Sequence, residues 1–134
     1  MAKTAAIILA AGQGSRMRSN LAKVLHPLAG LEMVNHVVRN VRLAAFDKIV
    51  VVIGHQADKV QAVLDGVTTA EQKEQLGTGH AVDQCRAILA DFDGPVLVTY
   101  GDTPLFRGET FKKLLEYHLE EGAAATILTA KFAD

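Results

Sequence analysis

Three short apolar runs constrain the fold of this chain more than any other feature of its sequence. They cover residues 5–10 (AAIILA), 48–53 (KIVVVI) and 95–100 (PVLVTY). Continuous apolar runs of this length are typical of strands that are buried on both faces of a parallel sheet. Apolar residues at helical spacing follow each run, beginning with a helix expected over 32–45. The alternation predicts an α/β fold, mostly a parallel sheet with helices on both faces.

Weaker patterns fill in the other elements, while residues 12–30 show no clean period and are expected to form a long loop. The expected elements are a helix over 60–64, a short strand over 67–70, a helix over 81–89 with Thr78 as its N-cap, a helix capped by Thr110 and stopped by Gly122, and a fifth strand over 124–130.

Composition narrows the class of protein. The 134 residues are 49% hydrophobic and 22% charged, as expected for one globular domain with a core. A net charge of -1 gives no global field that would attract nucleic acid or an acidic membrane. A single cysteine, Cys85, excludes an internal disulfide framework and suits a reducing cytosol. After the opening MAKT only seven apolar residues, 5–11, come before Gly12, too few for a membrane span, so we expect a cytoplasmic protein.

A glycine-rich loop follows the first apolar run. Its small residues at 10–12 and 14 leave backbone N–H groups open to a ligand, and Arg16 adds a rigid fork of donors. This combination favours a phosphate site, although a plain glycine-rich turn has the same sequence signature. Lys23, further along the loop, is either a second cation for a triphosphate or a solvated surface charge.

Two further stretches are expected at the same edge of the sheet, because ligands of parallel α/β sheets bind at the carboxyl ends of the strands. Asp102 follows the strand ending at residue 100 and could hold Mg²⁺ against phosphate oxygens; its alternative role is to cap the turn before Pro104. The stretch 72–78 (QKEQLGT) offers the amides of Gln72 and Gln75 for reading a base edge, or is an ordinary polar loop.

Several other kinds of site do not fit. The GxxxxGK[ST] motif of P-loop enzymes is absent. A dinucleotide site requires a third glycine where Met17 stands and an acidic residue where the second strand ends in Gly54-His55, which argues against a dehydrogenase. The five histidines have no metal-binding spacing with Cys85, which lies on an apolar helical face and is expected to be inert core.

Four motifs together resemble the bacterial N-acetylglucosamine-1-phosphate uridylyltransferases. They are LAAGQGSRM at 9–17, KVLH at 23–26, EQLGTGHA at 74–81 and GDTPL at 101–105. The first alone is shared by many sugar-phosphate nucleotidyltransferases, whereas EQLGTGHA is more specific. The resemblance implies a Rossmann-like nucleotidyltransferase fold, incomplete at its C-terminus, with residues 1–134 as the nucleotide-binding part. The acetyltransferase β-helix domain of the bifunctional family proteins, through which they are expected to form homotrimers, is absent from this sequence.

The resemblance also implies residue roles. Arg16 and Lys23 would be catalytic and would stabilise the triphosphate and its leaving pyrophosphate. Asp102 would bind Mg²⁺, the implied cofactor. The implied nucleotide-binding residues are Leu9, Ala10, Ala11, Gly12, Gly14, Lys23, Gln72, Gly77, Thr78, Tyr100 and Gly101. Of these, Gln72 and Gly77 would read uracil.

The implied reaction transfers a uridylyl group from UTP to N-acetylglucosamine-1-phosphate and yields UDP-N-acetylglucosamine and pyrophosphate for cell-wall precursor synthesis. The alternatives are a related nucleotidyltransferase acting on another sugar phosphate or alcohol phosphate, and a non-catalytic nucleotide-binding fragment. Neither nucleic acid nor a membrane is an expected partner.

Overall fold

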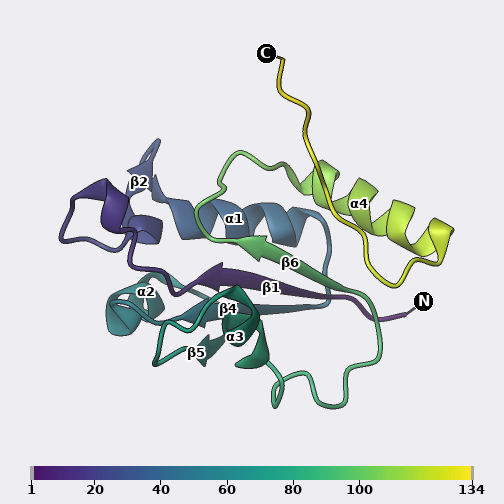
Figure 1. Cartoon of the computed structure of the whole chain (residues 1–134), viewed down its shortest axis with the longest axis horizontal. Coiled ribbons are helices and arrows are strands. Elements are labelled where there is room, and N and C mark those ends of the chain that lie inside the picture. Colours follow the sequence, from purple (N-terminus) through teal and green to yellow (C-terminus); the bar gives the residue numbers. More distant parts are fainter. Residues whose placement is uncertain (1, 134) are drawn as a thin grey trace.

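A parallel four-stranded sheet forms the centre of the molecule. The computed structural model describes residues 2–133. The strands are β1 (Ala5–Ala10), β4 (Lys48–Ile53), β5 (Thr68–Glu71) and β6 (Val96–Tyr100), in the order β5-β4-β1-β6 (Figure 1). The predicted apolar runs are therefore strands, and the predicted short strand near residue 67 is β5. Because β1 lies between β4 and β6, its carboxyl end opens beside theirs.

Helices cover both faces of this sheet. The α-helices are α1 (Met33–Leu43), α2 (Ala57–Val63), α3 (Thr78–Asp83) and α4 (Gly108–Glu121). Ala6 and Ile8 of β1 point into a core that is shared with α1, α2 and α4. Ile7, on the opposite face, packs into a second core with Ala81 and Cys85. Alternate residues of one strand thus serve two cores, which explains why β1 is apolar without interruption.

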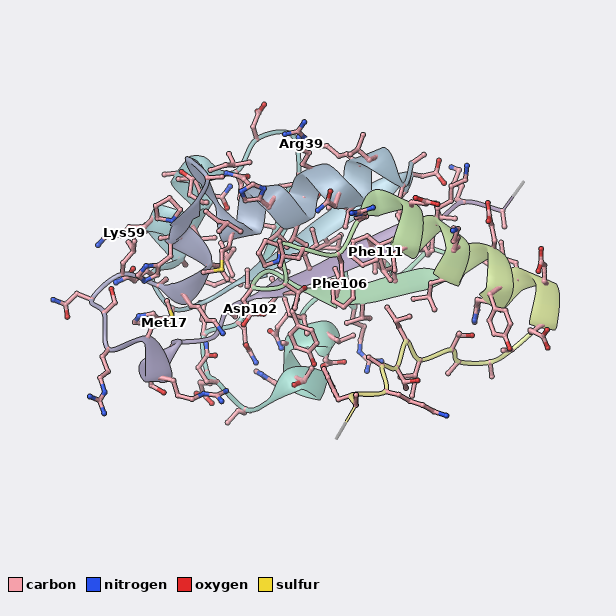
Figure 2. All side chains as sticks on the ribbon, turned by 90° about the horizontal axis from the view of Figure 1, so that it is seen from above. Met17, Arg39, Lys59, Asp102, Phe106 and Phe111 are labelled. Carbon is pink, nitrogen blue, oxygen red and sulfur yellow. The ribbon has the colours of Figure 1, made fainter. Side chains whose placement is uncertain are left out.

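An aromatic contact joins the loop after β6 to the first turn of α4. The rings of Phe106 and Phe111 lie with their centroids 5.9 Å apart (Figure 2). Phe111 is buried in the core with α1, and Phe106 stands in the loop that joins β6 to α4. The contact therefore packs the loop that begins at Asp102 against α4.

Some helix boundaries differ from those predicted. Helix α3 has Gly77 as its N-cap and Thr78 as its first residue, so the predicted Thr78 cap is wrong. Thr110 does not cap α4, which begins two residues earlier with Arg107 as its N-cap. In both cases no side chain caps the helix, and backbone geometry starts it instead. The helix predicted over 81–89 ends at Asp83 and continues as turns. Gly122 ends α4 in a left-handed conformation, as predicted.

The long loop after β1 contains short turns and a hairpin that the sequence pattern did not predict. It holds two 3-10 turns, η1 (Ser15–Met17) and η2 (Lys23–Leu25), and a hairpin of β2 (Pro27–Leu28) and β3 (Leu31–Glu32). Ala29 and Gly30 at the tip both have positive φ, as a two-residue hairpin turn requires. Elements of two or three residues are too short to give a periodic signal.

The fifth strand predicted over 124–130 is wrong. The structure gives this segment no strand pairing within residues 2–133, and it runs as extended chain past α4 (Figure 1). Its apolar and β-branched residues favour a strand, but strand formation needs a neighbour in a sheet. Ile127 is 82% exposed as a result. Among the described residues, none of the helices is long and apolar enough to cross a membrane.

Candidate functional site

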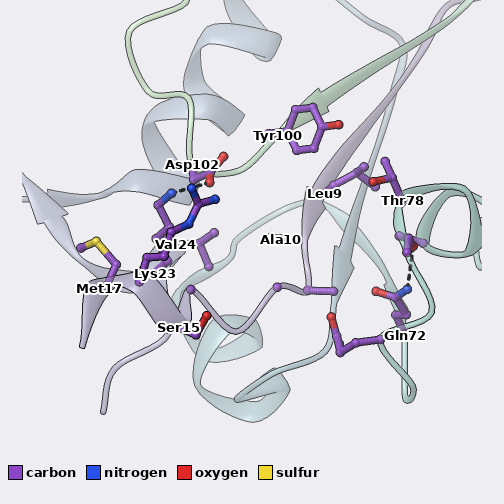
Figure 3. A pocket seen from close by; sticks show the side chains of 17 residues that line it. Leu9, Ala10, Ser15, Met17, Lys23, Val24, Gln72, Thr78, Tyr100 and Asp102 are labelled. Carbon is purple, nitrogen blue, oxygen red and sulfur yellow. Dashed lines mark hydrogen bonds and ion pairs between the residues drawn. The ribbon is translucent and has the colours of Figure 1, made fainter. Parts of the chain in front are cut away.

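A pocket of about 450 Å³ opens at the carboxyl ends of the strands (Figure 3). The loop after β1, the loop after β5 and the end of β6 all contribute to it. Its lining residues are Leu9, Ala10, Ala11, Gly12, Gly14, Ser15, Arg16, Met17, Lys23, Val24, Gln72, Gln75, Gly77, Thr78, Ala81, Tyr100 and Asp102. Every predicted site residue except Gly101 is in this set. The three stretches that were expected to converge from distant parts of the sequence do so.

Gly101 contributes from below the pocket instead of lining it. It is buried, and its N–H donates to the carbonyl of Leu9 at 2.8 Å. A Cβ added at this position would lie 3.0 Å from the Cβ of Ala10. The glycine therefore lets the start of the Asp102 loop pack closely against the end of β1. The hydrogen bond and the close packing join two walls of the pocket.

Gly14 brings Lys23 into the site. Gly14 has φ 62°, and a Cβ built on it would lie only 2.5 Å from the Cβ of Lys23. Both the backbone angle and the close contact require glycine here. Two sequence positions nine residues apart are thereby packed together.

Gln56 holds the chain just before Lys23. Its Oε1 accepts from the N–H of Ala22 at 2.8 Å, and its Nε2 donates to the carbonyl of Asn20. Gln56 itself adopts a left-handed conformation immediately before α2, at φ 53°. The Gln56 side chain thus holds the backbone at two positions, Asn20 and Ala22, in the segment that leads to Lys23.

Lys23 and Asp102 form an ion pair across the pocket. The Lys23 Nζ lies 2.9 Å from Asp102 Oδ2, and both side chains are about one-third exposed (Figure 3). Asp102 does not act as a simple turn cap: the hydroxyl of Thr103 makes the local bond, donating to the carbonyl of Tyr100 at 2.9 Å. With Arg16, the lining carries two cations and one carboxylate. The local charge is positive although the chain as a whole is slightly acidic.

Gln72 forms the opposite end of the pocket and is only 3% exposed. Its backbone N–H donates to the carbonyl of Ile53 at 2.7 Å, which extends the β4–β5 ladder by one residue. Its side-chain Nε2 donates to the carbonyl of Gly77 at 3.2 Å. The interpretation of residues 72–78 as an ordinary exposed polar loop therefore does not describe Gln72.

Gly54 allows this end of the pocket to close against β1. A Cβ at Gly54 would lie within 2.9 Å of the Gln72 carbonyl, the Gln75 side chain and the Cβ of Ala11. The N–H of His55 donates to the carbonyl of Ala11 at 3.1 Å. The glycine at the end of β4, where a dinucleotide site would have an acidic residue, thus serves close packing.

The shape and charge of the pocket suit a phosphorylated ligand with a planar group. Backbone at Gly12 is open, since a Cβ there would meet no atom within 4 Å. Open N–H groups and two cations at one end can neutralise phosphates. The buried amide of Gln72 at the other end can read a polar ring edge.

Comparison with known proteins supports the same interpretation. Residues 6–133 match the family described as the MobA-like NTP transferase domain. The chain belongs to this family.

The similarity of this NTP transferase domain to individual proteins covers only part of them. It is 54% identical over 133 residues to the bifunctional protein GlmU of Streptococcus equi subsp. zooepidemicus, covering 98% of this chain and 29% of that protein. The chain thus spans less than a third of the length of this relative.

Solved structures of nucleotidyltransferases have the same fold. A nucleotidyl transferase from Methanothermobacter thermautotroptrophicus aligns with TM-score 0.73 and 27% identity, over 86% of this chain and 57% of that one. A UDP-glucose pyrophosphorylase from Acinetobacter baumanii aligns with TM-score 0.76 and 17% identity, over 92% and 54%. The predicted Rossmann-like nucleotidyltransferase fold is confirmed.

Four residues that line the pocket of this NTP transferase domain carried no predicted role: Ser15, Met17, Val24 and Ala81. Ser15 and Met17 belong to the η1 turn, and Val24 belongs to η2, so short 3-10 turns bring them to the site. The first turn of α3 contributes Ala81. Nothing in their residue types indicates a ligand. Gln56 and Gly54, which organise the pocket from outside, were likewise not recognised as site residues from the sequence.

Proposed function

We propose that this NTP transferase domain transfers a uridylyl group from UTP to N-acetylglucosamine-1-phosphate, releasing pyrophosphate. The observation that carries the proposal is the convergence of the Gly12–Arg16 loop, Lys23, Gln72 and Asp102 on one pocket. The identity of 54% to a GlmU protein supports the choice of substrates. Residues 1–134 are then the nucleotide-binding part of a longer enzyme.

The reaction needs no covalent intermediate with the protein. The phosphate oxygen of the sugar phosphate is already an anion, so attack on the α-phosphorus needs no general base. The main barriers are the approach of two anions and the charge that builds on the leaving pyrophosphate. Arg16 and Lys23 would neutralise that charge from the side of the glycine-rich loop. The Gly12 backbone would bind the phosphates, and Gln72 with Gly77 would bind uracil.

The remaining predicted contacts follow the walls of the pocket. Leu9, Ala10 and Ala11 would lie along the uridine and its phosphates, and Thr78 and Tyr100 would lie against the nucleotide sugar. Gly101 would act by packing under Leu9 and Ala10, as its hydrogen bond to Leu9 indicates. These surfaces carry no charge and would contact the nucleotide by packing.

Asp102 would be the protein's carboxylate ligand for Mg²⁺ that arrives with the nucleotide. Within residues 2–133 no group of three or more His, Cys, Asp or Glu side chains could form a metal site on its own. Mg²⁺ commonly takes one carboxylate together with phosphate oxygens and water, which a site with Asp102 as its carboxylate could supply. When bound, the ion would supply positive charge to the phosphates. Lys23, which pairs with Asp102 here, lies at the same end of the pocket and would bind phosphate oxygens there.

The resemblance of the motifs also supports a proposal about where the enzyme acts, what its product is used for and how it assembles. We infer a cytoplasmic enzyme that supplies UDP-N-acetylglucosamine to cell-wall synthesis and assembles as a homotrimer through a domain outside residues 1–134.

The test is a comparison of nucleotides. Pyrophosphate release is measured with Mg²⁺, N-acetylglucosamine-1-phosphate and either UTP, CTP, GTP or dTTP, and binding of each nucleotide is followed by calorimetry. The proposal predicts turnover with UTP and selective binding of UTP. Selective turnover of another nucleotide would indicate a different nucleotidyltransferase, and UTP binding without turnover would indicate a nucleotide-binding fragment.

A further inference from the structure

The amide of Gln72 is held in one orientation by two acceptors. Its Nε2 lies 3.2 Å from the carbonyl oxygen of Gly77 and 2.9 Å from Nδ1 of His80. A backbone carbonyl can only accept, so the atom beside Gly77 must be the amide nitrogen and not the oxygen. The same carbonyl also accepts from the N–H of Ala81 at 3.1 Å, which anchors it in the first turn of α3.

The two hydrogens of this amide group are then both used. One goes to the carbonyl of Gly77, and the other requires a lone pair on Nδ1 of His80. A hydrogen bond from Gln72 to this atom requires a neutral ring with its proton on Nε2. His80 is half-buried on α3, beside the buried Gln72.

A second amide, that of Gln84, competes for the lone pair of the ring. Gln84 Nε2 lies 3.2 Å from His80 Nε2 and donates to the backbone carbonyl of His80 at 3.0 Å. A neutral imidazole can accept at only one of its nitrogens. Only one of the two amide nitrogens can therefore donate to the ring. Gln84 already has an acceptor in that carbonyl, and the shorter contact is the one to Gln72, so the Gln84 nitrogen is the one that lies beside the ring without a hydrogen bond to it. The lone pair therefore belongs on Nδ1.

This arrangement leaves the amide oxygen of Gln72 free on the side of the pocket. Figure 3 shows the Gln72 nitrogen on the hydrogen bond to the Gly77 backbone and the oxygen turned away from it, toward the pocket. Uracil carries a donor at N3, whereas cytosine carries an acceptor at N3 and an amino group at C4. An oxygen facing N3 attracts the first and repels the second. A flipped amide would reverse that preference.

We propose that His80 is a positioning residue for base selection, which locks the Gln72 amide with its oxygen toward the base and so favours uracil over cytosine. The inference rests on the proposed function, because it assumes that the base of a pyrimidine nucleotide lies against Gln72. His80 does not line the pocket and acts through Gln72.

The variants separate an acceptor at position 80 from mere packing. His80→Leu removes the acceptor, and His80→Asn can present Oδ1 to the Gln72 nitrogen. His118→Leu on α4 is the matched control, because His118 is half-buried and bonded to a side chain, Thr126, outside this pocket. Dissociation constants for Mg²⁺-UTP and Mg²⁺-CTP are measured by calorimetry for wild type and each variant, and thermal unfolding reports whether each variant is folded.

We expect the wild type to prefer UTP, and His80→Leu to reduce the UTP-to-CTP preference roughly five- to tenfold, the loss of about one hydrogen bond. His80→Asn retains most of the preference, and His118→Leu retains all of it. A preference unchanged in His80→Leu, or equal weakening of both nucleotides, would overturn the inference. A wild type that binds neither nucleotide, or prefers CTP, would instead count against the proposed function.

A measurement on the unmodified chain tests the same claim even if His80→Leu fails to fold. Imidazole ¹⁵N chemical shifts distinguish the two neutral tautomers of a histidine. The inference requires the proton of His80 on Nε2 at neutral pH. A proton on Nδ1 would remove the acceptor of the Gln72 amide and give the lone pair to the side of Gln84, which would refute the inference.

Discussion

The sequence predicted which charged side chains lie in the pocket. It did not predict which residues they bind. Arg16, Lys23 and Asp102 stand out in the sequence because charged residues follow apolar runs and glycines. The direct ion pair of Lys23 with Asp102 and the bond between Gln72 and His80 depend on folding across 79 and 8 positions respectively. No local pattern specifies such pairs, because the loops that carry them lack regular geometry.

Replacing Arg16 tests a leaving-group role. Arg16 is exposed on η1, and the only ion pair formed by cations of the pocket within the described residues is the one of Lys23. Arg16→Ala is expected to lower kcat by about a hundredfold, since the guanidinium would act on charge that develops in the transition state. UTP affinity measured by calorimetry should fall much less. Equal losses in kcat and affinity would assign Arg16 to ground-state binding.

Replacing Asp102 tests the metal site. Asp102→Asn removes the carboxylate, and we expect binding of Mn²⁺ in the presence of UTP to weaken roughly tenfold or more by electron paramagnetic resonance. Stability should change by only about 0–1 kcal/mol, because the pair with Lys23 is partly exposed. Unchanged Mn²⁺ binding would remove Asp102 from the metal site.

Helices and strands were predictable from the sequence where an apolar run or a helical spacing is long. They were not predictable where the element depends on pairing with a neighbouring strand. The strands β1, β4 and β6 and the helix α1 follow directly from apolar runs and helical spacing. The segment 124–130 also has strand-forming residues, Thr126, Ile127 and Thr129, but no pairing within the described chain. The glycine-rich loop owes its conformation to single positions, of which Gly14 is the most constrained.

Two glycines of one loop should therefore respond differently to alanine. Gly14→Ala is expected to destabilise the fold by about 1–3 kcal/mol, because φ is 62° and the new Cβ would collide with Lys23. Gly12→Ala meets open space, so its stability should stay within about 0.5 kcal/mol of wild type. Its Cβ would stand in the pocket and weaken UTP binding. Urea unfolding and calorimetry measure the two effects; equal destabilisation would contradict this reading of the loop.

In the molecule as a whole, two cores on either face of one sheet hold the strand ends in place, and this arrangement was predictable. Continuous apolar strands alternating with amphipathic helices leave few alternatives to a covered parallel sheet. The placing of a binding site at the carboxyl edge follows from that topology. Which helix covers which face, and the joining of Cys85 to the core on the α3 side, came only from the structure.

Cys85 reports on the integrity of that core. Burial raises the pKa of its thiol from 9.0 to about 11, because the thiolate is poorly solvated there. In the unfolded chain the thiol ionises first, so the stability due to the neutral buried thiol is full below pH 9 and is lost as the pH rises toward 11. Cys85 should be unreactive to a thiol reagent at pH 8 until urea unfolds the chain. A Cys85→Ala variant shows whether the pH dependence belongs to this thiol; rapid native labelling would contradict its burial.

The claim that three distant loops meet over one nucleotide is tested most directly by paramagnetic broadening with Mn²⁺-UTP in ¹H–¹⁵N spectra of the ¹⁵N-labelled chain. The account predicts strong broadening of amide signals near Asp102, Gly12 and Gly14, weaker broadening near Gly77, and none on the far end of α4. Broadening centred away from Asp102, or confined to one of the three loops, would contradict it.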